Sequence, residues 1–261
     1  MKKFLKIASI VLVIAMVACF AACGKEPVTD NDGTTAPEGK KVLTMATNAE
    51  FPPYGYKDDS GEYVGFDLDL AQEVCDRNNW TLVKQPIDWD AKDSELDSGS
   101  IDCIWNGFTI NGRENDYTWS EPYIDNKQVV IVKTDSGINS LADLEGKTVE
   151  TQKDSSALSA LEGDNKTLAD TFAELTEVAD YNTAFMDLES GACDAVAMDI
   201  GVAQYQIESR GDGFVMLEEK LATEQYAVGF KLGNTALKDQ VEATLLEMAA
   251  DGTVEKIAAE W

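Results

Sequence analysis

The stretch LDSGSIDCI at residues 96–104 recurs as LESGACDAV at residues 188–196. In each copy, residues suited to the end of a helix precede a glycine, and a short apolar segment follows it. One such helix-to-strand turn is ordinary in a globular protein. Two copies that begin 92 residues apart indicate two similar lobes, each with its own sheet.

Helix and strand signals alternate on both sides of these two copies. Apolar residues four apart predict helices at Phe66, Leu70 and Val74, with Asp67 and Asp69 in a favourable first turn, and at Leu237, Val241 and Leu245, with Gly252 at the end. Strands are predicted at residues 42–47, 81–87, 101–105, 128–133, 147–151 and 192–198. This alternation predicts an α/β fold with largely parallel sheets. Ligands bind beyond the carboxyl ends of strands in such sheets, so residues 105–109 and 198–199 are where we expect a site.

The composition excludes several kinds of function. The chain carries 21 basic and 48 acidic residues, a formal charge of −27, which argues against nucleic acid and anionic lipid as partners. It contains no histidine, which removes the commonest metal ligand and the commonest general base. Cys75, Cys103 and Cys193 are far apart and are expected to be buried thiols. We therefore expect no metal site, no cofactor and no catalytic residue.

The first 22 residues are predicted to be an export signal. Lys2, Lys3 and Lys6 precede an apolar run that ends at Ala22 and is short for a spanning helix. The sequence Ala21-Ala22-Cys23 resembles the lipobox of a bacterial lipoprotein, which implies cleavage before Cys23 and lipidation of its thiol. Cys19 is the second candidate, and an ordinary signal peptide that contains cysteine is the alternative. Residues 23–40 are then a lipidated cysteine followed by a flexible tether.

The globular part resembles a known family, the polar amino-acid receptors of ABC importers in solute-binding family 3. The matching stretches are residues 46–54, 64–70, 102–113, 119–123, 141–149 and 193–199. The resemblance implies a two-lobed clamp of the periplasmic-binding-protein type (type II), with two sheets and two hinge crossovers. Lobe 1 is then formed by residues 41–124 and 227–261, lobe 2 by residues 128–223, and the hinge by residues 125–127 and 224–226. Such lobes close around a ligand by a hinge motion.

The resemblance also implies the residues that bind the amino acid. Arg113 matches the clamp for the α-carboxylate, although it lies four residues after Thr109, one fewer than in the commoner pattern of the family. Asp199 matches the acceptor for the ammonium group. The other positions implied for the site are Asn48, Glu50, Phe51, Trp89, Asn106, Gly107, Thr109, Gln152, Ser155 and Ser156. Asn48 stands where many members have aspartate, and Glu50 could face either the pocket or solvent. Alternatives remain open, since Arg113 and Asp199 could be solvated, Ser155 a helix cap, and Phe51 and Trp89 ordinary core.

The function implied is that of a monomeric extracytoplasmic receptor that delivers a free polar L-amino acid to ABC permease subunits. Its lipid would be its only membrane attachment, at the outer face of the cytoplasmic membrane of a Gram-positive bacterium. The ligand side chain is expected to be basic, as in arginine or lysine, or neutral and polar, as in glutamine or cystine. An enzyme of the cyclohexadienyl dehydratase kind, with Glu50 as its extra carboxylate, is one alternative. A sensor lobe that signals through a partner is another.

Overall fold

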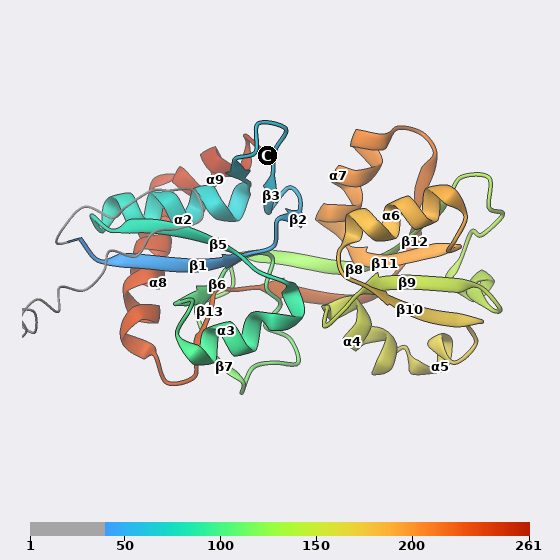
Figure 1. The fold of residues 1–261 in the computed structure, drawn as a ribbon, viewed down its shortest axis with the longest axis horizontal. Coiled ribbons are helices and arrows are strands. Elements are labelled where there is room, and N and C mark those ends of the chain that lie inside the picture. Colours follow the sequence, from blue (N-terminus) through green and yellow to red (C-terminus); the bar gives the residue numbers. More distant parts are fainter. Residues whose placement is uncertain (1–39) are drawn as a thin grey trace, which may run out of the picture. The chain divides into compact units, whose positions relative to one another are not determined.

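The computed structural model describes residues 40–261, which form two five-stranded sheets and a smaller three-stranded sheet (Figure 1). The signal peptide predicted over residues 1–22, the lipidated Cys23 and the tether as far as residue 39 lie outside the described residues. Within residues 40–261, none of the helices combines the length and apolar character that crossing a bilayer requires.

The first large sheet has the strand order β5-β1-β6-β13-β7. Its strands are β1 (Val42–Thr47), β5 (Thr81–Pro86), β6 (Cys103–Ile104), β7 (Tyr117–Trp119) and β13 (Gly229–Lys231). Strand β1 is parallel to β5 and β6, whereas β13 is antiparallel to β6 and β7. The helical segments around it are α2 (Phe66–Arg77), η1 (Trp89–Ala91), α3 (Lys92–Ser98), α8 (Thr235–Asp251) and α9 (Thr253–Ala258). The small antiparallel sheet of β2 (Glu50–Phe51), β3 (Gly55–Lys57) and β4 (Tyr63–Val64) follows β1 along the chain.

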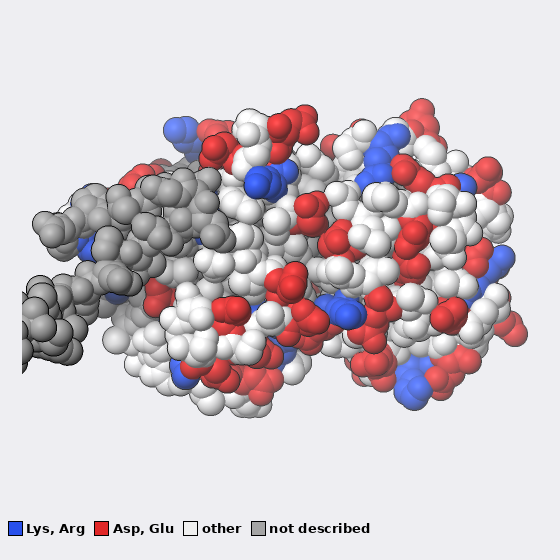
Figure 2. Space-filling model, viewed as in Figure 1, with Lys and Arg blue, Asp and Glu red and all other residues white. Residues whose placement is uncertain are grey.

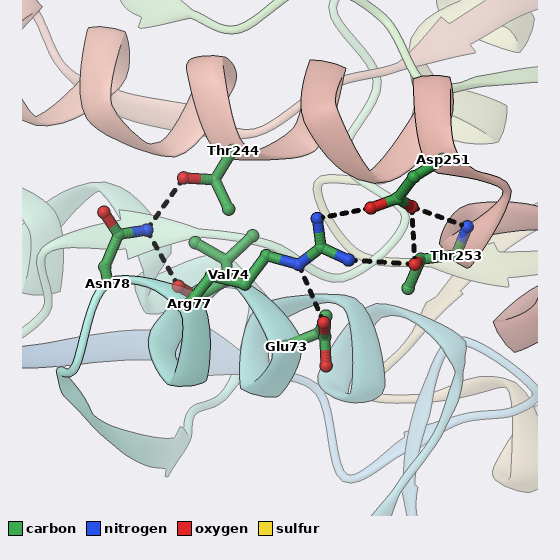
Figure 3. Close-up of polar contacts among 7 residues, drawn as sticks. All are labelled: Glu73, Val74, Arg77, Asn78, Thr244, Asp251 and Thr253. Carbon is green, nitrogen blue, oxygen red and sulfur yellow. Dashed lines mark hydrogen bonds and ion pairs between the residues drawn. The ribbon is translucent and has the colours of Figure 1, made fainter.

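A polar cluster attaches the two C-terminal helices to α2, as Figure 3 shows. The Arg77 guanidinium pairs with Asp251 at 2.8 Å, donates to the Thr253 hydroxyl at 2.9 Å, and pairs with Glu73 at 2.7 Å. The next residue, Asn78 at the C-terminal cap of α2, donates its side-chain amide to the Thr244 hydroxyl at 2.8 Å. The first sheet and its helices are therefore built from both ends of the described chain.

The second large sheet has the strand order β10-β9-β11-β8-β12. Its strands are β8 (Ile124–Lys133), β9 (Thr148–Gln152), β10 (Glu174–Val178), β11 (Ala195–Asp199) and β12 (Phe214–Tyr226). Helices α6 (Tyr181–Ser190) and α7 (Ile200–Arg210) cover one face, and α4 (Ser156–Glu162) and α5 (Lys166–Ala169) cover the other (Figure 1). A short η2 turn (Leu141–Leu144) precedes β9.

Strand β8 lies inside this sheet, and its side chains alternate between the two faces. Val129 and Ile131 pack in the core beneath α6 and α7, whereas Val130 and Val132 pack in the core beneath α4. All four are nearly inaccessible to solvent, as expected for a strand that is covered on both faces.

The repeated sequence motif builds the same structure twice. Gly99 ends α3 and Gly191 ends α6, both in the left-handed conformation, with φ of 79° and 80°. Directly before the strand that follows each glycine, an aspartate accepts from a backbone N–H of the neighbouring strand: Asp102 from Thr44 at 2.8 Å, and Asp194 from Thr148 at 2.9 Å. The prediction of two similar lobes with one sheet each is confirmed at this level.

Both large sheets are mixed, so the prediction of largely parallel sheets is wrong for half of their pairings. Strand β8 is antiparallel to both of its neighbours, β11 and β12. The chain passes between the sheets twice, before β8 and after β12, and the two passages are hydrogen-bonded to each other through Ser120 N–H to Val228 at 3.0 Å and Tyr123 N–H to Tyr226 at 2.9 Å. Residues 125–127 and 224–226, predicted as the hinge, lie within β8 and β12, where they pair with one another.

Candidate functional site

A cavity lies at the carboxyl ends of strands from both large sheets, within one compact unit of the chain. It is lined by residues that follow or end strands β1, β6, β9 and β11, together with the loops beside them. These residues are Asn48, Phe51, Trp89, Asn106, Gly107, Thr109, Arg113, Gln152, Ser155, Ser156 and Asp199. Eleven of the twelve positions implied by the family resemblance thus surround one space.

Glu50 is the twelfth position, and it does not line this cavity. Its carboxylate accepts from the Asn182 amide at 2.9 Å, so it links β2 to helix α6 beside the cavity. Burial, and then the charge of Asp180, raise the pKa of this carboxyl. A residue that starts a two-residue strand can face either way, and its neighbour Phe51 takes the inward direction.

The loop after β6 forms one wall of the cavity. The Asn106 oxygen accepts from the Thr47 hydroxyl at 2.7 Å and from the Asn48 N–H at 2.9 Å, which leaves its amide nitrogen buried and without a partner among the described residues. Gly107 has a φ of 58° and packs so closely that a Cβ atom would lie 2.5 Å from the Phe51 ring. Only glycine fits this position, where the backbone comes close to the cavity.

Buried Asp67, at the start of α2, holds this loop from behind. Its carboxylate accepts from the Gly107 N–H at 2.6 Å. Burial raises the pKa of Asp67 to about 7, although the bond from Gly107 acts in the opposite direction. Asp67 therefore does more than occupy the first turn of a helix, as the sequence predicted, because it also positions the wall of the cavity.

Arg113 spans the cavity from the side of the first sheet to that of the second. Its Nη1 donates to the Thr109 carbonyl at 3.3 Å and to the Ser156 hydroxyl at 3.2 Å, and its Nη2 donates to the Asp154 carbonyl at 3.2 Å. A guanidinium has five N–H groups, so two remain without a partner among the described residues. Two such groups suffice for a carboxylate.

A charged contact reinforces this crossing. Lys92, at the start of α3, is only 1% exposed, and it forms an ion pair with Asp154, which precedes α4. Asp154 adopts a φ of 53°, an unusual conformation for a residue other than glycine. The same residue therefore accepts from Arg113 through its backbone and pairs with Lys92 through its side chain.

Two further residues of the second sheet present defined polar groups to the cavity. Gln152 donates its amide nitrogen to the Ala179 carbonyl at 3.0 Å, which leaves its oxygen to accept from a ligand. Ser155 is the N-cap of α4, and its hydroxyl accepts from the Leu158 N–H at 3.1 Å. The capping role that the sequence allowed for Ser155 is thus observed, while its backbone still borders the cavity.

The rings of Phe51 and Trp89 are buried beside the cavity, with exposed fractions of 5% and 9%. Phe51 packs against Tyr181 with ring centroids 6.0 Å apart, and Trp89 meets Phe108 edge to face at 5.6 Å. Each ring is therefore held by the core on one side and borders the cavity on the other.

Asp199 lies at the end of β11, and sequence reasoning missed the network around it. Its Oδ1 accepts from the Tyr226 hydroxyl at 2.6 Å and from the amides of Asn126 and Gln128 at 2.7 Å each. Burial, and then the charge of Glu224, raise the pKa of Asp199 to about 7. A signal for the network is present in the sequence. Asn126 and Gln128 are polar and two residues apart, as are Glu224 and Tyr226, so each pair faces one side of its strand, and the hinge brings the two strands together.

Among residues 40–261, no group of histidine, cysteine, aspartate or glutamate side chains is arranged to hold a metal ion. The thiols of Cys75, Cys103 and Cys193 are buried and unpaired with one another, as predicted. The geometry of the cavity instead offers a guanidinium, a carboxylate and two aromatic rings, which suits a small zwitterion with a polar side chain.

Comparison with known proteins points the same way. The family model for bacterial extracellular solute-binding proteins, family 3, matches residues 43–261. The arginine-binding extracellular protein ArtP of Bacillus subtilis is 30% identical, over 100% of this chain and 98% of its own length. The L-cystine-binding protein TcyA of the same bacterium is 28% identical, over 95% of this chain and 94% of its own. An ABC uptake transporter substrate-binding protein of Streptococcus pneumoniae, solved with bound histidine, matches with a TM-score of 0.81 and 32% identity, over 84% of this chain and 92% of that one.

Proposed function

We propose that this chain, which belongs to the bacterial extracellular solute-binding proteins of family 3, binds a free polar L-amino acid in the cavity described above and delivers it to ABC permease subunits. It is an extracellular amino-acid-binding protein of an ABC uptake system. The relatives described above are binding proteins by name, and the chain is a binding protein rather than an enzyme of the dehydratase kind. The observation that carries the proposal is that eleven residues from both sheets line one cavity.

The charged ends of the ligand define the roles of the polar residues. In this proposal the two unpartnered N–H groups of Arg113 hold the α-carboxylate. The ammonium group lies between Asp199, the Thr109 hydroxyl and the Gly107 carbonyl. An ammonium that leaves water needs a carboxylate partner to offset its desolvation, and Asp199, which is 4% exposed, provides one.

The side chain of the ligand would lie between Phe51 and Trp89. We propose a side chain that donates hydrogen bonds, because the free oxygen of Gln152 can only accept. Arginine, lysine, glutamine and cystine remain the candidates. With Glu50 engaged by Asn182, a basic side chain would be held by ring faces and neutral acceptors rather than by a second carboxylate.

We further propose two lobes, a hinge between them and a lipid anchor. Residues 41–124 and 227–261 would form one lobe and residues 128–223 the other, with a hinge at residues 125–127 and 224–226. Cys23 would carry the lipid that attaches a monomeric receptor to the outer face of the cytoplasmic membrane of a Gram-positive bacterium. Acidic side chains are spread over the face drawn in Figure 2, interrupted by isolated basic ones, which favours a soluble receptor over a nucleic-acid-binding surface.

Calorimetric titration of the purified chain with the twenty L-amino acids and L-cystine tests this function. We expect saturable binding at one site per chain for at least one basic or neutral polar amino acid, and weaker binding by Arg113→Ala. Absence of binding across the whole panel, or binding that Arg113→Ala leaves unchanged, would contradict the proposal.

A further inference from the structure

A second carboxylate, Glu224, lies behind the end of the cavity where Asp199 is found. Glu224 on β12 is 5% exposed, and its Oε1 accepts from the amide nitrogens of Asn126 at 2.7 Å and Gln128 at 2.8 Å. These are the nitrogens that also donate to Asp199 at 2.7 Å. Every N–H of the two amides is thus directed at a carboxylate.

This arrangement leaves two buried amide oxygens without hydrogen-bond partners among the described residues. Because both amides turn their nitrogens toward the carboxylates, their oxygens, Asn126 Oδ1 and Gln128 Oε1, are buried and lack a partner among the described residues. A buried acceptor without a partner costs about 1–3 kcal/mol. Two such unpartnered acceptors lie beside the cavity. We therefore expect the negative charge that the amides stabilise to take part in ligand binding.

The hydroxyl of Thr109 is fixed by the same pair. Thr109 Oγ1 donates to Glu224 Oε1 at 2.8 Å. A hydroxyl has one proton, and with that proton committed to Glu224 only its lone pairs remain for a ligand. Thr109 lines the cavity, so Glu224 turns the hydroxyl into an acceptor at the place proposed for the ammonium group.

The charge of the pair is not balanced by the protein. Among the ion pairs formed by residues 40–261, none involves Asp199 or Glu224. The titratable side chains that face the pair are the phenols of Tyr54, Tyr181 and Tyr226. Arg113, the one basic residue among those that line the cavity, is engaged by Thr109, Ser156 and Asp154. The wall therefore lacks a cation where it holds two acids.

We infer that Glu224 is a positioning residue, which holds the Thr109 hydroxyl and the Asp199 carboxylate ready to accept from an α-ammonium group, and that the pair gives up a proton when that group binds. The proton leaves the carboxyl pair for solvent, and the ligand enters as a full ammonium ion, so the site passes from one negative charge to two as it gains one positive charge. The inference rests on the proposed function, because it requires an amino-acid ligand.

The ionisation of Asp199 agrees with this geometry. Burial, followed by the charge of Glu224, raises the pKa of Asp199 to about 7, so the ligand-free pair holds a proton in mildly acidic solution. An ammonium group nearby favours the ionised form and expels this proton. Affinity should then rise with pH up to neutrality and level off above it.

Calorimetry in buffers of different ionisation enthalpy counts the protons that binding releases. The probe is the tightest binder among L-arginine, L-lysine and L-glutamine, whose side chains do not titrate near neutrality. We expect release of close to one proton per bound probe at about pH 6, and of almost none at about pH 8.

Variants distinguish a positioning role of Glu224 from a general loss of structure. Glu224→Gln should lower the affinity about ten- to hundred-fold at about pH 8, and should reduce the proton release at about pH 6, because burial alone then keeps the pKa of Asp199 raised. Glu218→Gln, which removes an exposed carboxylate from the same strand, should change neither quantity. Thr109→Val should lose affinity but keep the proton release, because the carboxylate pair remains.

Two results would overturn the inference while leaving the proposed function intact: binding by the wild-type chain without proton release at about pH 6, or wild-type behaviour of Glu224→Gln. The first needs no variant, so it decides even if Glu224→Gln fails to fold. Failure of the whole amino-acid panel to bind would instead remove the proposed function, and the inference with it.

Discussion

Asp199 and Glu224 stand on β11 and β12, on either side of β8, and accept hydrogen bonds from the same two amide groups of that middle strand, at 2.7–2.8 Å. Three strands are thereby linked by side chains at the point where the chain passes between its two sheets. Tyr226, the last residue of β12, also donates to Asp199 at 2.6 Å. A ligand that binds Asp199 would therefore be linked directly to the segments that connect the two sheets.

Arg113→Lys should weaken amino-acid binding by roughly 2–4 kcal/mol, because a point charge replaces a planar group that can hold both carboxylate oxygens. Lysine also cannot reproduce the contacts to Ser156 and to the carbonyls of Thr109 and Asp154 together. Calorimetric titration measures the loss, with Arg77→Lys, remote from the cavity, as the matched control. Equal affinities of Arg113→Lys and the wild type would remove Arg113 from the site.

Asp67 makes the folded state more stable in mild acid than at neutrality. Its pKa is raised to about 7 in the folded chain by burial, so the folded state keeps a proton that the unfolded state has lost. This contribution is complete below about pH 4 and disappears as pH rises through about 7, a change on the order of 4 kcal/mol in the free energy of unfolding.

Denaturant unfolding of the ligand-free chain between about pH 4.5 and pH 7.5 checks this dependence. Asp67→Asn should make the profile less steep, since an amide oxygen can still accept from Gly107 without titrating, while buried Asp199 keeps its own contribution. Asp76→Asn, an exposed change on the same helix, should leave the profile as it is. A stability that rises with pH over this range would show that Asp67 is ionised in the folded chain.

The Lys92–Asp154 ion pair should favour the closed form of the cavity. Asp154→Asn removes the charge that pairs with a lysine of 1% exposure, and we expect amino-acid affinity to fall by a few-fold, corresponding to roughly 1 kcal/mol. Small-angle scattering should show that this variant needs more ligand than the wild type to become compact. Asp170→Asn, which breaks an exposed pair with Lys166, is the control. Identical titration curves for the two variants would deny the pair any part in closure.

Cys23→Ser should release the protein from membranes, because the proposed lipid anchor depends on that thiol. The motive is the sequence Ala21-Ala22-Cys23 after an apolar run. Incorporation of labelled palmitate, together with membrane fractionation, measures the effect. Continued incorporation in Cys23→Ser would place the lipid elsewhere, and Cys19→Ser then tests the remaining candidate.

The repeated motif made much of the fold predictable. Gly99 and Gly191 end helices because no other residue adopts a left-handed conformation so readily, and that preference is visible in sequence. The residues beyond β6 and β11 could be proposed as a site for a general reason, the position of ligands at the ends of such strands. The structure brings them together around one cavity.

What escaped prediction depends on pairing between distant segments. The antiparallel direction of β8 follows from the return of the chain through β12, about 90 residues later, and no local pattern encodes it. The contact of Asn126 with Glu224 depends on the register of those strands. The family resemblance implies Glu50 as a site residue without fixing whether it faces the cavity. The direction of a side chain in a two-residue strand is decided by its surroundings, here Asn182.

A crystal structure of the chain with its tightest-binding amino acid tests directly whether Arg113 and Asp199 hold the two charged ends of the ligand. We expect the α-carboxylate to lie within hydrogen-bonding distance of the Arg113 guanidinium, and the ammonium to contact Asp199 Oδ2 and Thr109 Oγ1, with Glu224 directly behind. A ligand bound outside this cavity, or one whose ammonium is held without Asp199 and Thr109, would contradict it.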